Sequence, residues 1–397
     1  MGIIKKELIK NLSNASKIAL PSSIDRCIRC NTCKYAKDQY YKSCPSGEKF
    51  LFESFWASGR IKIARGILNG DIPITEELYD AVFACPTCGA CEISCQAPHN
   101  DTIVTIIESL RELIVDSIRA PERQSKMFER IESHHNPYNE PHFDVDEIKK
   151  KYVLPDKAEI VYFIGCTSNY RQQTIRDATL SVLKKLEVDY TVINEHCCGS
   201  PLIRTGQVKN VFNLMQHNMD EIRRSGAKLI LTSCAGCYRT LSKDFPKFGY
   251  EFSSEIKILH ISQYLNEYFE KNPFPLRQKD TNLLITYHDP CHLGRHMGVY
   301  EAPRQLITKI PHLSLIEMER NRDLAWCCGS GGGVKIGYPE WALEVATSRL
   351  EEAENTGTEI VVSTCPFCKT NLKDAAIAQK STMEVMDLVE ILDKYLP

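Results

Sequence analysis

Short apolar runs alternate with longer amphipathic stretches over the second part of the chain. The runs occupy residues 159–165, 189–194, 228–233, 282–287 and 359–364, and they are rich in β-branched residues. The stretches between them have apolar residues at helical spacing. Because this alternation is typical of βαβ units, the sequence predicts an α/β fold with parallel strands from about residue 156 onward.

The first part of the chain has a helical pattern instead. Residues 1–26 resemble a helical lead-in, residues 48–68 are amphipathic, and residues 101–135 carry apolar residues at helical spacing. Residues 136–155 are rich in proline, asparagine and charge, which indicates a linker. We therefore predict a multidomain chain of mixed α+β and α/β class. Its expected parts are a helical domain at 1–110, a helical segment and linker at 111–155, and α/β domains at 156–275 and 276–397.

All eighteen cysteines fall into four sets with the spacing of metal ligands, and none is left over. The first two sets have four members each: Cys27, Cys30, Cys33 and Cys44, then Cys85, Cys88, Cys91 and Cys95. The other two have five members each: Cys166, Cys197, Cys198, Cys234 and Cys237, then Cys291, Cys327, Cys328, Cys365 and Cys368. The chain is therefore expected to bind metal clusters.

The second half is an internal duplication. The cysteine sets repeat with steps of 125 residues (Cys166 to Cys291), 130 (Cys197 to Cys327) and 131 (Cys234 to Cys365). Most of the predicted strands lead directly into a cysteine, and ligands of open α/β sheets lie beyond the carboxyl ends of the strands. We expect two similar domains that face each other across a pseudo-two-fold axis, each with one five-cysteine site.

Charge and hydropathy exclude several classes of partner. The net charge of −2 gives no electrostatic basis for binding nucleic acid or an anionic membrane. No apolar run reaches the length of a membrane span, and no signal-peptide core is recognisable at the N-terminus. The expected location is the cytoplasm, where dense cysteines indicate metal more often than disulfides, or its membrane face through a partner.

The two N-terminal sets favour cubane iron–sulfur clusters. In two-cluster ferredoxins each Cys-x2-Cys-x2-Cys loop supplies three ligands, and the fourth comes from the other motif. One [4Fe–4S] cluster would then take Cys27, Cys30, Cys33 and Cys95, and the other Cys85, Cys88, Cys91 and Cys44. Two departures from the ferredoxin pattern are the ten residues before Cys44 and the Gln96 that replaces proline after Cys95. Zinc, which also accepts four thiolates, is the alternative.

Each five-cysteine set has one thiolate too many for a cubane or for one zinc ion. Adjacent cysteines can bind two neighbouring irons, so an enlarged or opened cluster with a bridging thiolate is expected. The glycine after each Cys-Cys pair is expected to relieve crowding of backbone against the cluster. The run Gly329–Gly333 lacks the Gly-Lys-Ser/Thr ending of a phosphate loop, so we expect its backbone to pack closely on the cluster, with N–H groups toward sulfur, and to bind no nucleotide.

The five-cysteine pattern resembles the cysteine-rich (CCG) domain of heterodisulfide reductases. Two ferredoxin motifs followed by two such domains resemble the D subunit of the membrane-associated enzyme over about residues 25–372. The segments that support this are CPSGE (44–48), HCCGSPLIRTG (196–206), SCAGCYRTL (233–241), YHDPCHLGR (287–295), WCCGSGGGV (326–334) and CPFCKTNL (365–372).

The resemblance implies a catalytic subunit with two cubane and two noncubane [4Fe–4S] clusters. It would split the disulfide of coenzyme M and coenzyme B with electrons from a membrane b-type cytochrome or another donor subunit. The alternative is an electron-transfer subunit of a flavin-linked 2-hydroxy-acid (glycolate or lactate) dehydrogenase or of a sulfite-reduction complex. His196 and His292 are the leading candidate proton donors, and His288 and His296 are further candidates. Arg295 or Arg204 could hold an anionic substrate.

Overall fold

The computed structural model describes residues 3–36, 41–98, 101–272 and 282–397. Two compact units are present. The N-terminal unit comprises residues 1–130 together with 199–212 and 326–345, and the α/β unit comprises residues 131–198, 213–325 and 346–397. The predicted boundary between residues 275 and 276 lies outside the described residues.

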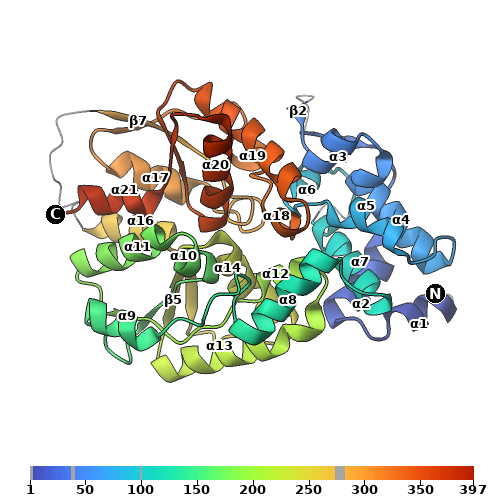
Figure 1. The fold of residues 1–397 in the computed structure, drawn as a ribbon, viewed down its shortest axis with the longest axis horizontal. Helices are drawn as coiled ribbons and strands as arrows, with labels where there is room; N and C mark the ends of the chain where they lie inside the picture. Colours follow the sequence, from blue (N-terminus) through green and yellow to red (C-terminus); the bar gives the residue numbers. More distant parts are fainter. Residues whose placement is uncertain (1–2, 37–40, 99–100, 273–281) are drawn as a thin grey trace. The chain divides into compact units, whose positions relative to one another are not determined.

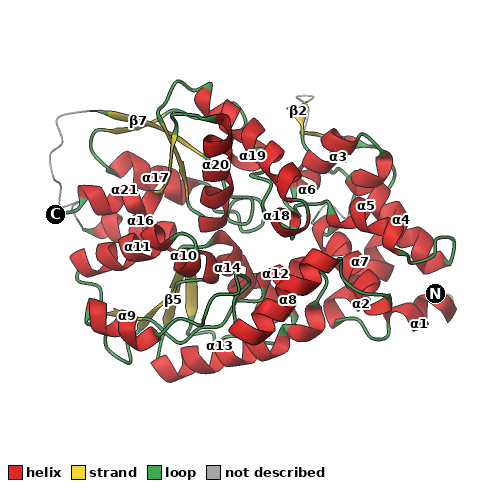
Figure 2. Ribbon diagram, in the orientation of Figure 1, coloured by secondary structure: helices red, strands yellow, loops and turns green. Residues whose placement is uncertain are grey.

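The N-terminal unit is helical apart from one short antiparallel hairpin, as Figure 2 shows. Its core forms where the apolar faces of α2, α4 and α7 meet, around Leu20, Ile61 and Ile107. The α-helices that the structure describes within residues 3–117 are α1 (Ile3–Ile9), α2 (Asn14–Ser23), α3 (Pro45–Phe50), α4 (Ala57–Asn69), α5 (Tyr79–Phe83), α6 (Ala90–Ser94) and α7 (Ile103–Ser117). The hairpin consists of β1 (Tyr35–Ala36) and β2 (Tyr41–Lys42).

The helical run predicted for residues 101–135 is two helices. α7 ends at Ser117, and α8 (Glu122–His134) begins after Pro121. Proline is well placed before a helix start because its missing N–H would have no partner there. The predicted linker also contains a helix, α9 (Val145–Tyr152), which the Asp144 carboxylate caps by accepting from the Asp146 and Glu147 amides. The linker prediction missed this N-cap signal.

The α/β unit contains two four-stranded parallel sheets (Figure 1). The first has the order β4-β3-β5-β6 and the second the order β8-β7-β9-β10. The strands of the first sheet are β3 (Ile160–Phe163), β4 (Tyr190–Thr191), β5 (Leu229–Thr232) and β6 (Lys257–His260). Those of the second are β7 (Leu283–Tyr287), β8 (Leu313–Leu315), β9 (Ile360–Ser363) and β10 (Glu384–Asp387). The identical strand order confirms the duplicated α/β fold, and the sequence missed β6, β8 and β10.

The two repeats pack on each other through equivalent helices. In the first repeat, α11 (Gln173–Lys185) follows the first strand and α16 (Ile261–Lys271) follows the last. Their counterparts in the second repeat are α17 (Glu301–Lys309) and α21 (Leu388–Tyr395). α11 packs against α21, and α16 packs against α17, which is the arrangement that a two-fold axis requires (Figure 1). Both sheets therefore share one apolar core.

Candidate metal centres

The thiols of Cys27, Cys30, Cys33 and Cys95 lie around one cavity of the N-terminal unit. The loop from residue 27 to 33 can turn tightly because Arg29 and Asn31 adopt positive φ angles of 61° and 63°. Burial raises the pKa of the Cys33 thiol, and the thiols of Cys27 and Cys95 raise it further. The structure thus brings Cys95 to the first three-cysteine loop.

The thiols of Cys44, Cys85, Cys88 and Cys91 form a second group in the same unit. Cys44 is the N-cap of α3, where its Sγ accepts from the Gly47 amide at 3.4 Å. Burial raises the pKa of the Cys44 thiol to about 11, and the nearby Cys85 and Cys88 thiols act in the same direction. Burial likewise raises the pKa of Cys91, which interacts with the other three thiols.

Two buried arginines hold the second group in place, and the sequence reasoning did not single them out. Arg111 of α7 donates to the carbonyls of Val82, Phe83 and Cys85. Its Nη1 donates to the carbonyls of Arg204 at 2.6 Å and Gly332 at 2.8 Å. Those two carbonyls belong to segments that follow the two Cys-Cys pairs. Arg60 of α4 donates to the carbonyls of Phe55 and Ala81 and to Ser46 Oγ.

The glycine after each Cys-Cys pair allows the backbone to turn with a positive φ angle. Gly199 and Gly329 have φ angles of 86° and 81°, a region that disfavours side chains. A Cβ on Gly329 would also lie 2.6 Å from the Ala342 carbonyl oxygen. Further along, a Cβ on Gly332 would lie 2.3 Å from the Cys85 carbonyl oxygen. The backbone of Gly329–Gly333 was expected to pack on the cluster, whereas the neighbour of Gly332 is the Cys85 loop of the same unit.

The first five-cysteine set lies in the α/β unit, at the carboxyl ends of its strands. Cys166 begins α10 (Cys166–Tyr170) after β3, and Cys234 follows β5 directly. The remaining members are buried. Cys166 hydrogen-bonds to Cys197, which lowers the pKa of Cys166, but burial and the Cys198 thiol raise it overall. Cys237 hydrogen-bonds to Cys198 and Cys234, and these interactions link the five thiols into one group.

The thiols of the two repeats meet at Cys234 and Cys365. Cys365 follows β9, and its thiol hydrogen-bonds to both Cys234 and Cys368, the latter in α20 (Pro366–Gln379). The hydrogen bonds from Cys237 and Cys365 lower the pKa of Cys234.

The other cysteines of the second set lie on two separate segments. Cys291 lies beyond the end of β7. Cys327 and Cys328 are buried and lie on the 326–345 segment of the N-terminal unit, where the Gly329 amide donates to Cys327 Sγ at 3.3 Å.

His196 belongs to a stack of histidines beside the first set. Its ring lies between those of His135 and His217, with centroids 3.6 and 3.5 Å away. His142 meets it edge-on at 5.4 Å. Burial lowers the pKa of His196 to about 3, and the neighbouring imidazoles contribute to this shift. His196 is therefore neutral at neutral pH. The sequence did not anticipate the stack because its members are distant in the chain.

Two further candidate proton donors, and the two arginines that could bind an anionic substrate, contact specific residues. His292 Nε2 lies 3.3 Å from Arg239 Nη1, and the His292 and His296 rings meet edge-on at 5.0 Å. Arg295 donates to the carbonyls of Asp323 and Ala325. Arg204, in the N-terminal unit, forms a buried ion pair of 2.6 Å with Glu108.

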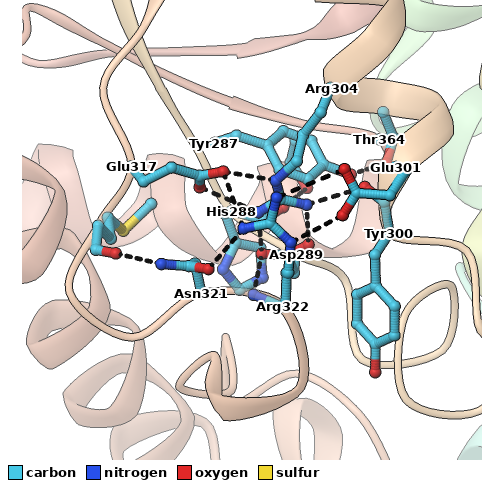
Figure 3. Close-up of polar contacts among 12 residues, drawn as sticks. Tyr287, His288, Asp289, Tyr300, Glu301, Arg304, Glu317, Asn321, Arg322 and Thr364 are labelled. Atoms are coloured by element: carbon cyan, nitrogen blue, oxygen red, sulfur yellow. Dashed lines mark hydrogen bonds and ion pairs between the residues drawn. The ribbon is translucent and has the colours of Figure 1, made fainter.

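A network of charged residues supports the loop that leads to Cys291 (Figure 3). Arg304 of α17 forms a bidentate pair with the Asp289 carboxylate, at 2.7 and 2.9 Å, and also contacts Glu317. Arg322 links Glu317 to Glu301. Because Asp289 and Arg304 are both at most 5% exposed at their side chains, the bidentate pairing is needed to satisfy two buried charges.

The donor groups fit iron–sulfur clusters. Each group consists of thiols only, and soft thiolate ligands suit zinc or iron–sulfur centres. Many of the thiols are buried with raised pKa values, so they need a positively charged group to become thiolates. Sets of five thiols exceed what one tetrahedral zinc ion can bind.

Comparison with known proteins agrees with this assignment. Residues 23–98 match the family of 4Fe-4S dicluster domains, and residues 160–242 and 285–373 match the cysteine-rich (CCG) domain. Fold and thiol groups together define an iron–sulfur oxidoreductase component. The chain belongs to the family of the heterodisulfide reductase D subunit, because it is 36% identical to a member over 94% of its length. The resemblance inferred from the motifs is confirmed.

That member is the D subunit of the dihydromethanophenazine:CoB–CoM heterodisulfide reductase of Methanosarcina mazei, of which 94% is covered. The B subunit of the fumarate reductase (CoM/CoB) of Methanothermobacter marburgensis is 34% identical over 79% of this chain and 61% of its own. A hypothetical protein from Helicobacter pylori has a similar fold, with a TM-score of 0.54 and 10% identity over 98% of this chain and 75% of its own. Within the described residues, no helix has the length and apolarity to cross a membrane.

Proposed function

We propose that this chain is the catalytic subunit of a heterodisulfide reductase that reduces the coenzyme M–coenzyme B disulfide. The observation that carries the proposal is the contact between the two five-cysteine sets at Cys234 and Cys365. A substrate disulfide has two sulfur atoms, and two adjacent metal centres could each receive one of them. Both sets retain all five cysteines, which favours disulfide chemistry over simple electron relay.

The proposed ligand assignment follows the thiol groups. The first cubane takes Cys27, Cys30, Cys33 and Cys95, and the second takes Cys85, Cys88, Cys91 and Cys44. The noncubane clusters take the two five-cysteine sets. When bound, the clusters supply electrons one at a time and iron that binds sulfur. Over the whole reaction the S–S bond breaks, two electrons and two protons are taken up, and two thiols leave.

The chain's own residues would shield the site and supply protons. Buried cysteines at the strand ends exclude water from the reacting sulfurs. Arg239 donates to His292 Nε2, which keeps this nitrogen an acceptor and leaves the ring proton on Nδ1. Because a neutral imidazole N–H is too weak an acid to protonate a thiolate, His292 is proposed as a proton donor in its imidazolium form, which requires Nε2 to leave Arg239. His196 is the other proposed donor, and because its burial in the histidine stack favours the neutral ring, it would have to take up a proton before delivering one.

Electrons would come from a partner, because two one-electron steps need an external donor. We propose a b-type cytochrome or another electron-donor protein as this partner, which would place the chain at the cytoplasmic face of a membrane. The name of the relative from Methanosarcina mazei includes dihydromethanophenazine, which is consistent with such a donor.

The deciding experiment is anoxic reduction of the coenzyme M–coenzyme B disulfide by reduced viologen. The protein must first contain about sixteen irons per chain, the number that four tetranuclear clusters require. We expect turnover without any partner protein. Absence of turnover in fully loaded protein would overturn the catalytic assignment in favour of an electron-transfer role.

Two substitutions test where the reaction occurs. Cys198→Ala and Cys328→Ala should each abolish disulfide reduction while the electron paramagnetic resonance (EPR) signals of the cubane clusters persist. Cys30→Ala is the matched control, since it removes a thiol from the first cubane set and should weaken a cubane signal instead. Retained activity in both Cys198→Ala and Cys328→Ala would contradict the proposed division of roles.

A further inference from the structure

The two repeats can be compared residue by residue because their strand ends share the same register relative to the cysteines. Tyr162 and Tyr287 each stand four residues before the first cysteine of their set. Tyr162 Oη hydrogen-bonds to Ser233 Oγ at 2.8 Å, and Tyr287 Oη bonds to Thr364 Oγ1 at the same distance. Ser233 and Thr364 each precede the fourth cysteine of their set.

This register reveals two positions at which the repeats differ. His288, directly after Tyr287, corresponds to Phe163. Arg349 of α19 (Pro339–Glu354) stands sixteen residues before Cys365, and Asn218 of α13 (Phe212–Ser225) stands sixteen residues before Cys234. The first repeat therefore has a phenyl ring and a neutral amide where the second has an imidazole and a guanidinium.

In the second repeat these two residues contact each other beside a cysteine. Arg349 Nε donates to His288 Nδ1 at 3.0 Å, and both side chains are buried. A ring nitrogen of His288 lies within 4.8 Å of Cys368 Sγ. In the first repeat, the Asn218 amide instead donates to the Cys197 carbonyl at 3.3 Å.

The contact determines the tautomer of His288. A guanidinium can only donate, so Nδ1 must accept and the ring proton must sit on Nε2. The ring then offers an N–H donor beside the Cys368 sulfur. An N–H donor that reaches a ligand sulfur can orient and tune that ligand, and the distance of at most 4.8 Å places the His288 ring in the neighbourhood of Cys368.

The buried guanidinium of Arg349 has one carboxylate partner among the described residues. Its Nη1 pairs with Glu352, and the same carboxylate also pairs with Arg320. The Asp289 carboxylate, next to His288 in the chain, is engaged by Arg304 (Figure 3). The second repeat therefore keeps a buried positive charge that the first repeat lacks at the corresponding position.

We propose that Arg349 and His288 are positioning residues that make the cluster of the second five-cysteine set easier to reduce than that of the first. A hydrogen bond to a ligand sulfur and a nearby cation both stabilise the extra electron of a reduced cluster, which raises its midpoint potential. The inference rests on the clusters of the proposed function, but it does not depend on which disulfide is the substrate.

Packing within the N-terminal unit is consistent with electrons passing from the second cubane cluster to the cluster of the second five-cysteine set. The turn at Gly331 and Gly332, which follows Cys327 and Cys328, lies against the backbone of Cys85 and Pro86. Arg111 ties the two together by donating to the carbonyls of Cys85 and Gly332. The second cubane loop is thus the direct neighbour of the second Cys-Cys turn.

The test is an EPR-monitored redox titration of iron-loaded protein, comparing wild type with His288→Phe. This substitution inserts the residue that the first repeat already accommodates. We expect two noncubane signals with different potentials in the wild type. In His288→Phe the higher midpoint potential should fall by at least about 59 mV. For a one-electron couple, this shift corresponds to a tenfold lower ratio of reduced to oxidised cluster at a fixed potential. The other signal is the internal reference and should not move.

Further variants separate positioning from mere structural support. His288→Gln keeps an N–H donor near the Nε2 position and should recover part of the shift. Arg349→Met should lower the same potential. Arg322→Gln removes a cation from the same network without contact to His288, and it should leave both potentials unchanged.

Two results would overturn the inference: equal potentials in the wild type, or a higher potential that stays in place in His288→Phe. Because each variant is titrated only after its iron content matches the wild type, loss of a cluster cannot imitate a shift. The titration uses no substrate, so absence of heterodisulfide turnover would overturn the proposed function and leave this result intact.

Discussion

At the scale of single residues, buried arginines connect the thiol groups to the backbone. Arg111 is fully buried and donates to carbonyls from three separate segments of the N-terminal unit. Burial lowers the pKa of Arg111 to about 10, so it is still charged at neutral pH. No hydrophobic residue could satisfy the same carbonyls, which explains a fully buried cation in α7.

We expect Arg111→Met to destabilise the protein strongly. Each buried carbonyl left without a donor costs about 1–3 kcal/mol, so the loss of stability should reach about 3 kcal/mol or more. Thermal denaturation of iron-loaded protein measures the change. Arg119→Met, which removes an exposed ion pair with Glu76 just beyond the end of the same helix, should melt like the wild type. Equal melting of both variants would show that Arg111 is dispensable.

At the scale of elements, the equivalent helix pairs join the two repeats. α11 packs on α21 and α16 on α17, and their apolar faces belong to a single core. The strand ends of both repeats are therefore held at one place, where Cys234 meets Cys365. The duplication thus positions the thiols as well as the sheets.

Leu392→Ala tests the contribution of this helix packing. Leu392 in α21 is fully buried, so its truncation should cost about 2–5 kcal/mol and lower the melting temperature. Ile377 in α20 is 68% exposed, and Ile377→Ala should have little effect. A Leu392→Ala variant as stable as Ile377→Ala would argue against a shared core between the repeats.

At the scale of the whole molecule, the two units differ in what stabilises them. The α/β unit has two parallel sheets around an extensive apolar core. The thiol loops of the N-terminal unit have little regular structure and use positive φ angles at Arg29, Asn31 and Thr87. Bound clusters would supply the cross-links that these loops need.

Removal of iron should therefore affect the units unequally. In cluster-free protein we expect fast hydrogen exchange in residues 27–33 and 85–95, while β3, β5, β7 and β9 stay protected. Hydrogen–deuterium exchange with mass spectrometry, comparing iron-loaded and cluster-free protein, measures this directly. Uniform loss of protection would mean that the sheets also require the clusters.

Part of the fold and site was predictable because it depends on local patterns. The five expected strands lie within the predicted ranges, and Cys166, Cys234 and Cys365 follow strand ends as expected. The strands β6, β8 and β10 were missed because they do not lie in apolar, β-branched runs like those of the predicted strands. The histidine stack and the Arg349–His288 contact were missed because they join residues that are far apart in the chain.

The sequence alone determined the number of thiol sets, the duplication and the family, because cysteine spacing and hydrophobic periodicity are properties of the chain itself. The ferredoxin pattern predicted that Cys95 groups with the first loop and Cys44 with the second, and the tertiary structure brings these thiols together. Only the tertiary structure decided that Cys234 meets Cys365. It also decided what surrounds them, including the difference between Phe163 and His288 at matching positions. Such contacts depend on how helices and sheets pack, and packing brings together residues whose separation in sequence carries no signal of their proximity.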